Sequence, residues 1–146
     1  MSTMGIIFSN IYDNNMGELT AMRTSASIPF GSRYRQVDFV LSNMANSGIK
    51  SIGIITKYNY QSLMDHLGNC EEWDLKLGDG VRFLPPYATG HTGAYHGKLE
   101  ALQTAMPVLE RSDADYVVLS DTTVLCAINF RLVVEEHIRS GCDITV

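Results

Sequence analysis

Asparagine and aspartate fill the first loop of the sequence, "SNIYDNNMG", which follows the apolar run Gly5–Phe8. A parallel α/β chain that binds nucleotides usually has glycines where the first strand meets its loop, because glycine permits positive φ and close backbone approach to a ligand. This loop has no glycine before Gly17. Asn10, Asp13 and Asn15 tolerate left-handed backbone, so a loop of similar shape is feasible. Their side chains would nevertheless intrude on a phosphate, and taken alone the loop is typical of a turn-rich surface.

Basic residues follow this loop. From residue 19 to residue 60 the sequence carries five basic side chains and one acid, so the local balance is 5 − 1 = +4. Arg23 and Lys57 belong to this set, which could form a patch for phosphates. On charge alone, an ordinary mixed surface is the favoured interpretation. For Lys57, a solvated loop lysine and a ligand contact are both open. The whole chain has a net charge of −5, which gives no electrostatic support for binding nucleic acid.

The elements that would position these residues follow from hydrophobic periodicity. Short β-branched runs predict five buried strands, at Gly5–Phe8, Ser51–Thr56, Val81–Leu84, Tyr116–Ser120 and Asp143–Val146. Apolar residues at three- and four-residue steps predict helices between them, over 37–44, 63–67, 99–109 and 132–138. Gly48 is expected to cap the first helix. Pro107 is expected to kink the third or end it early, and Leu132, Val133 and Ile138 form the apolar face of the fourth.

Alternating strands and helices predict an α/β fold with a mostly parallel sheet covered on both sides. Ligands of such sheets bind beyond the carboxyl ends of the strands. No run approaches the roughly 18 apolar residues of a membrane span, and the N-terminus lacks a secretory pattern, so a cytoplasmic location is expected. The three cysteines, Cys70, Cys126 and Cys142, are interpreted as buried structural thiols. Because the sequence stops directly after a predicted strand, it is interpreted as a fragment of a longer protein.

One contiguous block, "SIPFGSRYRQVDFVLSNMANSGI" at 27–49, resembles the glucose-1-phosphate adenylyltransferase (ADP-glucose pyrophosphorylase) family, together with "WDL" at 73–75 and "LPPY" at 84–87. The resemblance implies a Rossmann-like nucleotidyltransferase fold, a three-layer sandwich, with residues 1–146 as the N-terminal part of the domain. The remainder of that domain and the family's C-terminal β-helix would lie outside this chain.

In catalytic members of that family the first loop reads G-G-x-G-x-R-L, where glucose-1-phosphate attacks the α-phosphate of ATP. Backbone N–H groups, an arginine and Mg²⁺ then stabilise the leaving pyrophosphate. This pattern falls on residues 10–16 here, with every glycine replaced and Asn15 in place of the arginine. A K-P pair that follows in the family is replaced by Ser25 and Ala26, and only Arg23 keeps its charge.

The family's metal-binding aspartate aligns with the segment "SDTTVLC", and Thr123 stands at its position. A neutral hydroxyl is a poor replacement for a carboxylate on Mg²⁺. Asp121, two residues before Thr123, could recruit a metal or act in catalysis from a shifted position. A strand-end aspartate bonded to the adjacent turn is the favoured interpretation. The four histidines show no helical metal spacing, and no cofactor is expected in this chain.

Two further positions complete the candidate site. Gly97 is retained where the family approaches the nucleotide, but Lys98 and Leu99 replace a small T-A pair and are expected to narrow the pocket. Lys57 stands where the family has glutamine near the base. The resemblance therefore implies a degenerate nucleotide site, composed of Asn10, Asp13, Asn15, Arg23, Lys57 and Gly97.

Residues of the scaffold are retained, while residues at the phosphate-binding and metal-binding positions are replaced together. This pattern is most similar to the regulatory-type second subunit of this family in bacterial glycogen biosynthesis. The resemblance implies assembly with a catalytic subunit into a heterotetramer, and a response to ATP, ADP-glucose or a sugar-phosphate effector. Two alternatives stay open: an active nucleotidyltransferase that uses Asp121, and a sugar-nucleotide sensing module. Neither nucleic acid nor a membrane is an expected partner.

Overall fold

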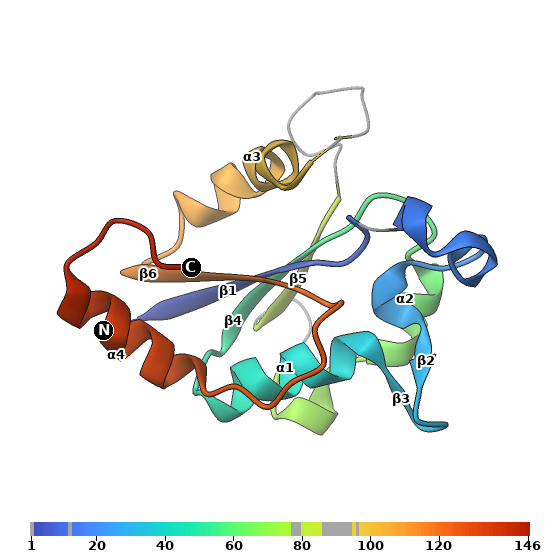
Figure 1. Cartoon of the computed structure of the whole chain (residues 1–146), viewed down its shortest axis with the longest axis horizontal. Helices are drawn as coiled ribbons and strands as arrows, with labels where there is room; N and C mark the ends of the chain where they lie inside the picture. The colour runs from blue at the N-terminus through green and yellow to red at the C-terminus, as the bar shows by residue number, and fades with distance from the viewer. Residues whose placement is uncertain (1, 12, 77–79, 86–94, 96) are drawn as a thin grey trace.

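The computed structural model describes residues 2–11, 13–76, 80–85, 95 and 97–146. Within these residues the core is a parallel sheet of order β5-β4-β1-β6. Its strands are β1 (Thr3–Phe8), β4 (Ser51–Ile55), β5 (Val81–Leu84) and β6 (Tyr116–Asp121). The predicted parallel α/β sheet is confirmed (Figure 1).

Helices cover both faces of this sheet. They are α1 (Gln36–Asn46), α2 (Gln61–Leu67), α3 (Lys98–Leu109) and α4 (Phe130–Ser140). Figure 1 shows α3 over one face and α1 and α4 over the other, which gives the three layers that were expected. A short antiparallel hairpin, β2 (Pro29–Phe30) and β3 (Tyr34–Arg35), leads into α1.

Short 3-10 helices occupy the connections. They are η1 (Asp13–Asn15), η2 (Gly17–Thr20), η3 (Ser25–Ser27) and η4 (Glu71–Trp73). Three of the four lie between β1 and the hairpin, so the described residues that connect these strands form a succession of compact turns.

Close packing explains glycine inside β1. A Cβ built on Gly5 would lie 2.5 Å from the sulfur of Met44, which itself is fully buried on α1. The helix therefore approaches the strand where the side chain is missing. As predicted, Gly48 follows the end of α1 with φ of +81°, and its N–H donates to the carbonyl of Ala45.

The register of the strands brings their carboxyl ends to one edge. Phe8 on β1 pairs with Ile55 on β4 and with Asp121 on β6. The residues that follow these strands, from Ser9 and Thr56 onwards, therefore lie beside Asp121 at the edge where parallel α/β sheets bind ligands.

Three predictions about the helices and the last strand are corrected. Of the two outcomes expected at Pro107, the early end does not occur: α3 continues to Leu109, and Glu110 N–H donates to the carbonyl of Met106. The face of α4 that packs on the core carries Phe130 and Val134, one helical turn apart. The three residues predicted for that face are 57%, 39% and 40% exposed, namely Leu132, Val133 and Ile138.

The predicted strand at Asp143–Val146 does not form, and Ile144 is 81% exposed. Its β-branched composition is not sufficient, because a strand needs a hydrogen-bonding neighbour and a surface to bury. The interpretation of the thiols is also corrected, since Cys70 is buried whereas Cys126 and Cys142 are exposed.

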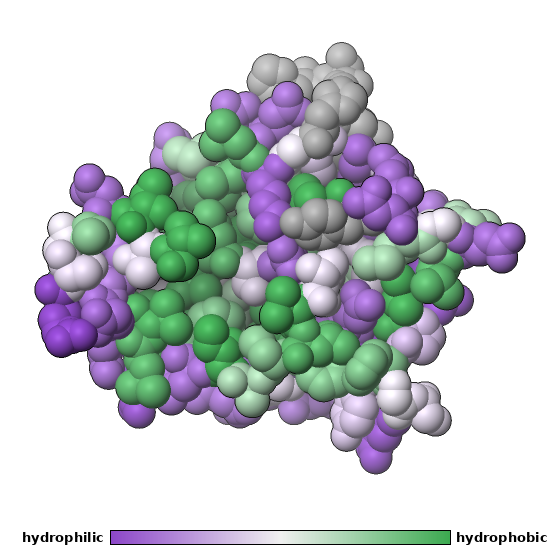
Figure 2. Space-filling model, viewed as in Figure 1, coloured by the Kyte–Doolittle hydropathy of each residue, from purple (hydrophilic) through white to green (hydrophobic). Residues whose placement is uncertain are grey.

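Hydrophobic side chains gather on the surface over β6, between α3 and α4 (Figure 2). Val117 and Leu119 of β6 are 43% and 49% exposed. A cavity of about 530 Å³ opens here beside Phe8, Leu119 and Phe130. None of the helices in the described part of the chain has the length and apolar character of a membrane span.

Candidate functional site

The first loop closes around the carboxylate of Asp13. Its Oδ1 accepts a hydrogen bond of 2.8 Å from the backbone N–H of Ser25, and its backbone carbonyl accepts one of 2.6 Å from Thr20 Oγ1. The side chain of Ser25 donates in turn to the carbonyl of Ser9 at the end of β1. The carboxylate of Asp13 therefore accepts a hydrogen bond from a backbone N–H, that of Ser25, which follows the first loop.

Asp13 is held in an unfavourable environment. The residue is only 4% exposed, and among the described residues its Oδ2 atom has no hydrogen-bond partner. Burial raises the pKa of this carboxyl, although the hydrogen bond from Ser25 and the positive charge of Lys57 act in the opposite direction. A negatively charged, incompletely bonded group at this point opposes the approach of a phosphate.

Asn10 and Lys57 lie together in a small polar cavity of about 70 Å³. Tyr95 joins them, since its hydroxyl donates to Asn10 Oδ1 over 3.0 Å and its backbone carbonyl accepts from Lys57 Nζ over 3.0 Å. The ammonium of Lys57 also lies 5.3 Å from the ring centre of Tyr95 and 5.4 Å from that of Tyr58. Lys57 is thus engaged by the protein and is not a solvated loop lysine.

Asp121 at the end of β6 is bonded on both oxygens. Its Oδ1 accepts from Thr123 N–H over 3.1 Å and from Thr123 Oγ1 over 2.7 Å. Its Oδ2 forms an ion pair of 2.9 Å with Lys98 Nζ at the start of α3. The favoured prediction, an aspartate bonded to the adjacent turn, is confirmed.

The pKa of Asp121 shifts in the opposite direction from that of Asp13. Burial alone would raise it, but the hydrogen bonds from Lys98 and Thr123 and the charge of Lys98 outweigh burial and lower it. Asp121 is therefore ionised at neutral pH, and its charge is already compensated within the chain.

These residues do not fit a magnesium site. Mg²⁺ requires several oxygen ligands, of which one or two are usually carboxylates. In the described part of the chain no group of three or more His, Cys, Asp or Glu could hold a metal ion. Asp121, the single carboxylate in question, has an ammonium group where a cation would have to sit.

The other predicted residues are more loosely placed. Asn15 is exposed in η1. Arg23 is half-buried and takes part neither in the hydrogen bond of Asp13 with Ser25 nor in those that link Asn10 and Lys57 through Tyr95. Gly97 precedes α3 with extended backbone, at φ of −152°, and a Cβ built on it meets nothing within 4 Å. The structure therefore brings Asn10, Asp13 and Lys57 together but does not require glycine at position 97.

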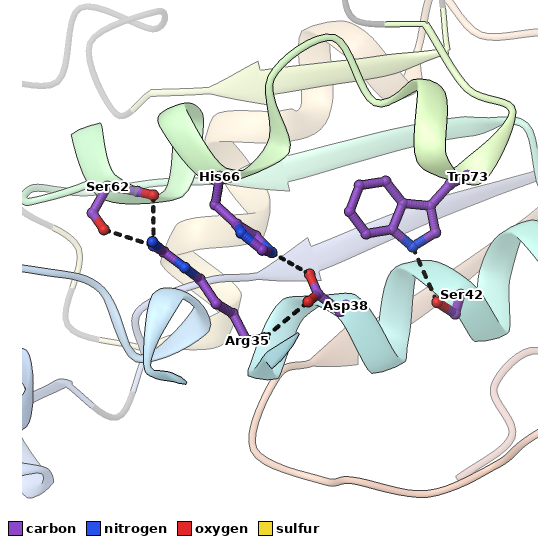
Figure 3. Close-up of polar contacts among 6 residues, drawn as sticks. All are labelled: Arg35, Asp38, Ser42, Ser62, His66 and Trp73. Atoms are coloured by element: carbon purple, nitrogen blue, oxygen red, sulfur yellow. Dashed lines mark hydrogen bonds and ion pairs between the residues drawn. The ribbon is translucent and has the colours of Figure 1, made fainter. Parts of the chain in front are cut away.

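The segment that carries the family resemblance has a structural role (Figure 3). Asp38 on α1 accepts from Arg35 N–H over 2.8 Å and lies 2.6 Å from His66 Nε2 on α2. The guanidinium of Arg35 donates to the hydroxyl and the carbonyl of Ser62. These bonds hold the hairpin, α1 and α2 together.

Trp73 extends the same junction towards η4. Its indole N–H donates to Ser42 Oγ over 3.0 Å, and the ring packs against the core beneath α1. Its predicted role as a packing residue, rather than a platform for a sugar, agrees with these contacts.

Two residues of the site were not recognised from the sequence. Tyr95 contacts both Asn10 and Lys57, and Lys98 was interpreted as bulk rather than as the ion partner of Asp121. A lysine in place of a small residue next to a lone strand-end aspartate is the signal that could have indicated the pair.

This chain is an α/β domain of the class that binds ligands beyond the carboxyl ends of parallel strands, and its buried polar side chains lie at that edge. The model of the nucleotidyl transferase family matches residues 14–146, and the chain belongs to this family.

Curated relatives narrow the comparison. The glycogen biosynthesis protein GlgD of Bacillus subtilis is 40% identical over 143 residues, which are 97% of this chain and 42% of that protein. The glucose-1-phosphate adenylyltransferase of Thermotoga maritima is 33% identical over 147 residues, 99% of this chain and 35% of that enzyme. The chain thus spans less than half the length of these relatives.

The fold is also found among solved structures. A crystal structure assigned as a glucose-1-phosphate thymidylyltransferase from Bacillus anthracis aligns with a TM-score of 0.74, over 94% of this chain and 51% of that one. Because the identity is 17%, this likeness supports the fold alone.

Proposed function

We propose that this chain belongs to a regulatory subunit of ADP-glucose pyrophosphorylase in bacterial glycogen biosynthesis, with little or no turnover of its own. It would act in the cytoplasm by assembling with a catalytic glucose-1-phosphate adenylyltransferase subunit into a heterotetramer. It would alter that partner's rate or its response to a sugar-phosphate effector, ATP or ADP-glucose. No metal cofactor is proposed for this chain.

One observation carries the proposal: the carboxylate of Asp13, in the first loop, is buried against the backbone N–H of Ser25, which follows that loop. A transferase needs donors there that are aimed at charge developing on the phosphates, and losing one such donor costs about 100- to 1000-fold in rate. An acid in that position both consumes a donor and repels the triphosphate. The similarity to GlgD supports the choice of pathway.

Such regulation requires that the subunit contact the active and inactive states of its partner differently. The network of Arg35, Asp38 and His66 supports a rigid body able to transmit such a difference, because it joins two helices and a hairpin. The scaffold is thus maintained although the groups suited to phosphate transfer are not.

Purified full-length protein tests the proposal in an assay of ADP-glucose formation from ATP and glucose-1-phosphate. We expect turnover at least about 100-fold below that of the catalytic partner, from the loss of donors at the loop. Addition of the subunit to the partner should raise the rate or shift the effector response, and Asp121→Asn should preserve this effect.

Two outcomes would select the alternatives. Robust turnover of the subunit alone that Asp121→Asn abolishes would identify an active nucleotidyltransferase. Saturable binding of ATP or ADP-glucose, with no turnover and no effect on the partner, would identify a sensing module.

A further inference from the structure

Lys98 lies at a junction of three elements. It begins α3, its Nζ atom pairs with Asp121 Oδ2 at the end of β6, and the same atom lies 6.0 Å from the ring centre of Phe8 at the end of β1. The ammonium therefore stands over the carboxyl ends of two adjacent strands, with a carboxylate beside it and an aromatic ring within cation–π distance.

The geometry leaves Asp121 little capacity for another cation. One oxygen accepts two hydrogen bonds from Thr123, the other accepts the ammonium of Lys98, and the side chain is only 15% exposed. A divalent cation at this carboxylate would have to displace the ammonium or lie next to it, and like charges repel strongly at such distances.

The ion pair is more than the absence of metal ligands. A lone carboxylate at a strand end would remain open to solvent cations, whereas here it is closed by a positive charge from a different element. Lys98 is 46% exposed at its side chain, so the ammonium reaches inward from the rim of the cavity beside β6 and is not buried by packing.

We propose that Lys98 is a built-in counter-ion that occupies the position on Asp121 which a divalent cation would need, and so keeps such ions from the end of β6. The inference rests on the proposed function and deepens it, because it assigns a residue that actively excludes the family's metal. The exclusion of divalent cations by Lys98 is a property of this protein itself and requires no partner subunit.

The test is Mn²⁺ binding to the full-length protein, measured by electron paramagnetic resonance of the free ion, with crystals soaked in MnCl₂ to locate bound ions by anomalous scattering. Wild type is expected to show no Mn²⁺ at Asp121. Lys98→Gln should bind one additional Mn²⁺, seen as a new anomalous peak beside Asp121. The double variant Lys98→Gln/Asp121→Asn should lose it.

Lys98→Arg and Lys76→Gln are the controls. The first keeps the positive charge and should continue to exclude Mn²⁺, and the second removes an exposed lysine elsewhere and should leave binding unchanged. A folded Lys98→Gln protein without the new site would overturn the inference. So would Mn²⁺ in wild type that Asp121→Asn removes, a measurement that does not depend on the folding of any Lys98 variant.

Failure of this inference and failure of the proposed regulatory role give different experimental results. A subunit that binds Mn²⁺ at Asp121 yet still activates the partner would refute the counter-ion alone. A subunit that excludes Mn²⁺ but neither assembles with the partner nor affects it would refute the regulatory function alone.

Discussion

An aspartate is buried in each of two regions of this protein, and the hydrogen bonding of its carboxylate differs between them. In the segment of residues 27–49, Asp38 is 8% exposed, and its two oxygens contact Arg35 N–H and His66. In the first loop, Asp13 is 4% exposed and has one backbone donor, while its second oxygen has no partner among the described residues.

The difference separates an aspartate that is hydrogen-bonded on both oxygens from one that is hydrogen-bonded on one oxygen among the described residues. Buried polar atoms are normally hydrogen-bonded, and exceptions are expected at functional or strained sites. Asp38 joins two helices, whereas Asp13 is buried at the edge of the sheet where the parallel strands end. Asp121 is a third case, in which an ion pair within the chain compensates the charge.

The largest effect is expected at Asp38. Asp38→Ala removes both the bond to Arg35 N–H and the contact with His66, so we expect the free energy of unfolding to fall by about 2 kcal/mol. Urea denaturation of the full-length protein measures it. Asp65→Ala on the exposed side of α2 is the control and should change stability by less than about 0.5 kcal/mol. Equal losses of stability in Asp38→Ala and Asp65→Ala would contradict the structural role assigned to Asp38.

Asp13→Asn is expected to act in the other direction. The amide oxygen can still accept from Ser25 N–H, while the buried negative charge disappears, so the free energy of unfolding should rise by about 1 kcal/mol. The same denaturation assay at pH 7 measures the gain. Asp113→Asn, at an exposed acid, serves as the matched control with no expected change. A clear loss of stability in Asp13→Asn would mean that the charge itself supports the loop.

The smallest effect is a difference in pH dependence between Asp13 and Asp121. Since burial raises the folded-state pKa of Asp13, the folded protein takes up a proton more readily than the unfolded chain. The penalty at Asp13 is thus present at neutral pH and fades as the pH falls through that raised pKa. The advantage of Asp13→Asn should fade with it.

Asp121 has the opposite sign, because Lys98 and Thr123 lower its folded-state pKa. Its contribution is present above the usual value of 3.8 and is lost as the pH falls through the lowered pKa. Lys98→Met should therefore cost less than about 1 kcal/mol at pH 7, since Lys98 is half-exposed, and the cost should shrink at acidic pH. The free energies of unfolding of Asp13→Asn and Lys98→Met, each relative to wild type, are measured from pH 7 down to pH 3. They should change in opposite directions, and parallel changes would contradict this account.

Much of the architecture could be predicted from sequence periodicity. β1, β4, β5 and β6 and the helices between them are local patterns, since buried parallel strands are continuous apolar runs and amphipathic helices repeat every three to four residues. The exceptions were set by contacts at a distance. Asp143–Val146 has strand composition without a strand, and α4 packs through Phe130 and Val134 rather than through its more numerous apolar neighbours.

For the site, the sequence by itself determined which groups were present: a first loop without glycine before Gly17, a single strand-end carboxylate at Asp121, and a lysine at position 98. Only the tertiary structure decided their states. Whether Asp13 is buried, and whether Lys98 reaches Asp121 across 23 residues, depends on how β1, β6 and α3 meet at one edge of the sheet. Burial and charge pairing act through space, so residue type alone cannot specify them.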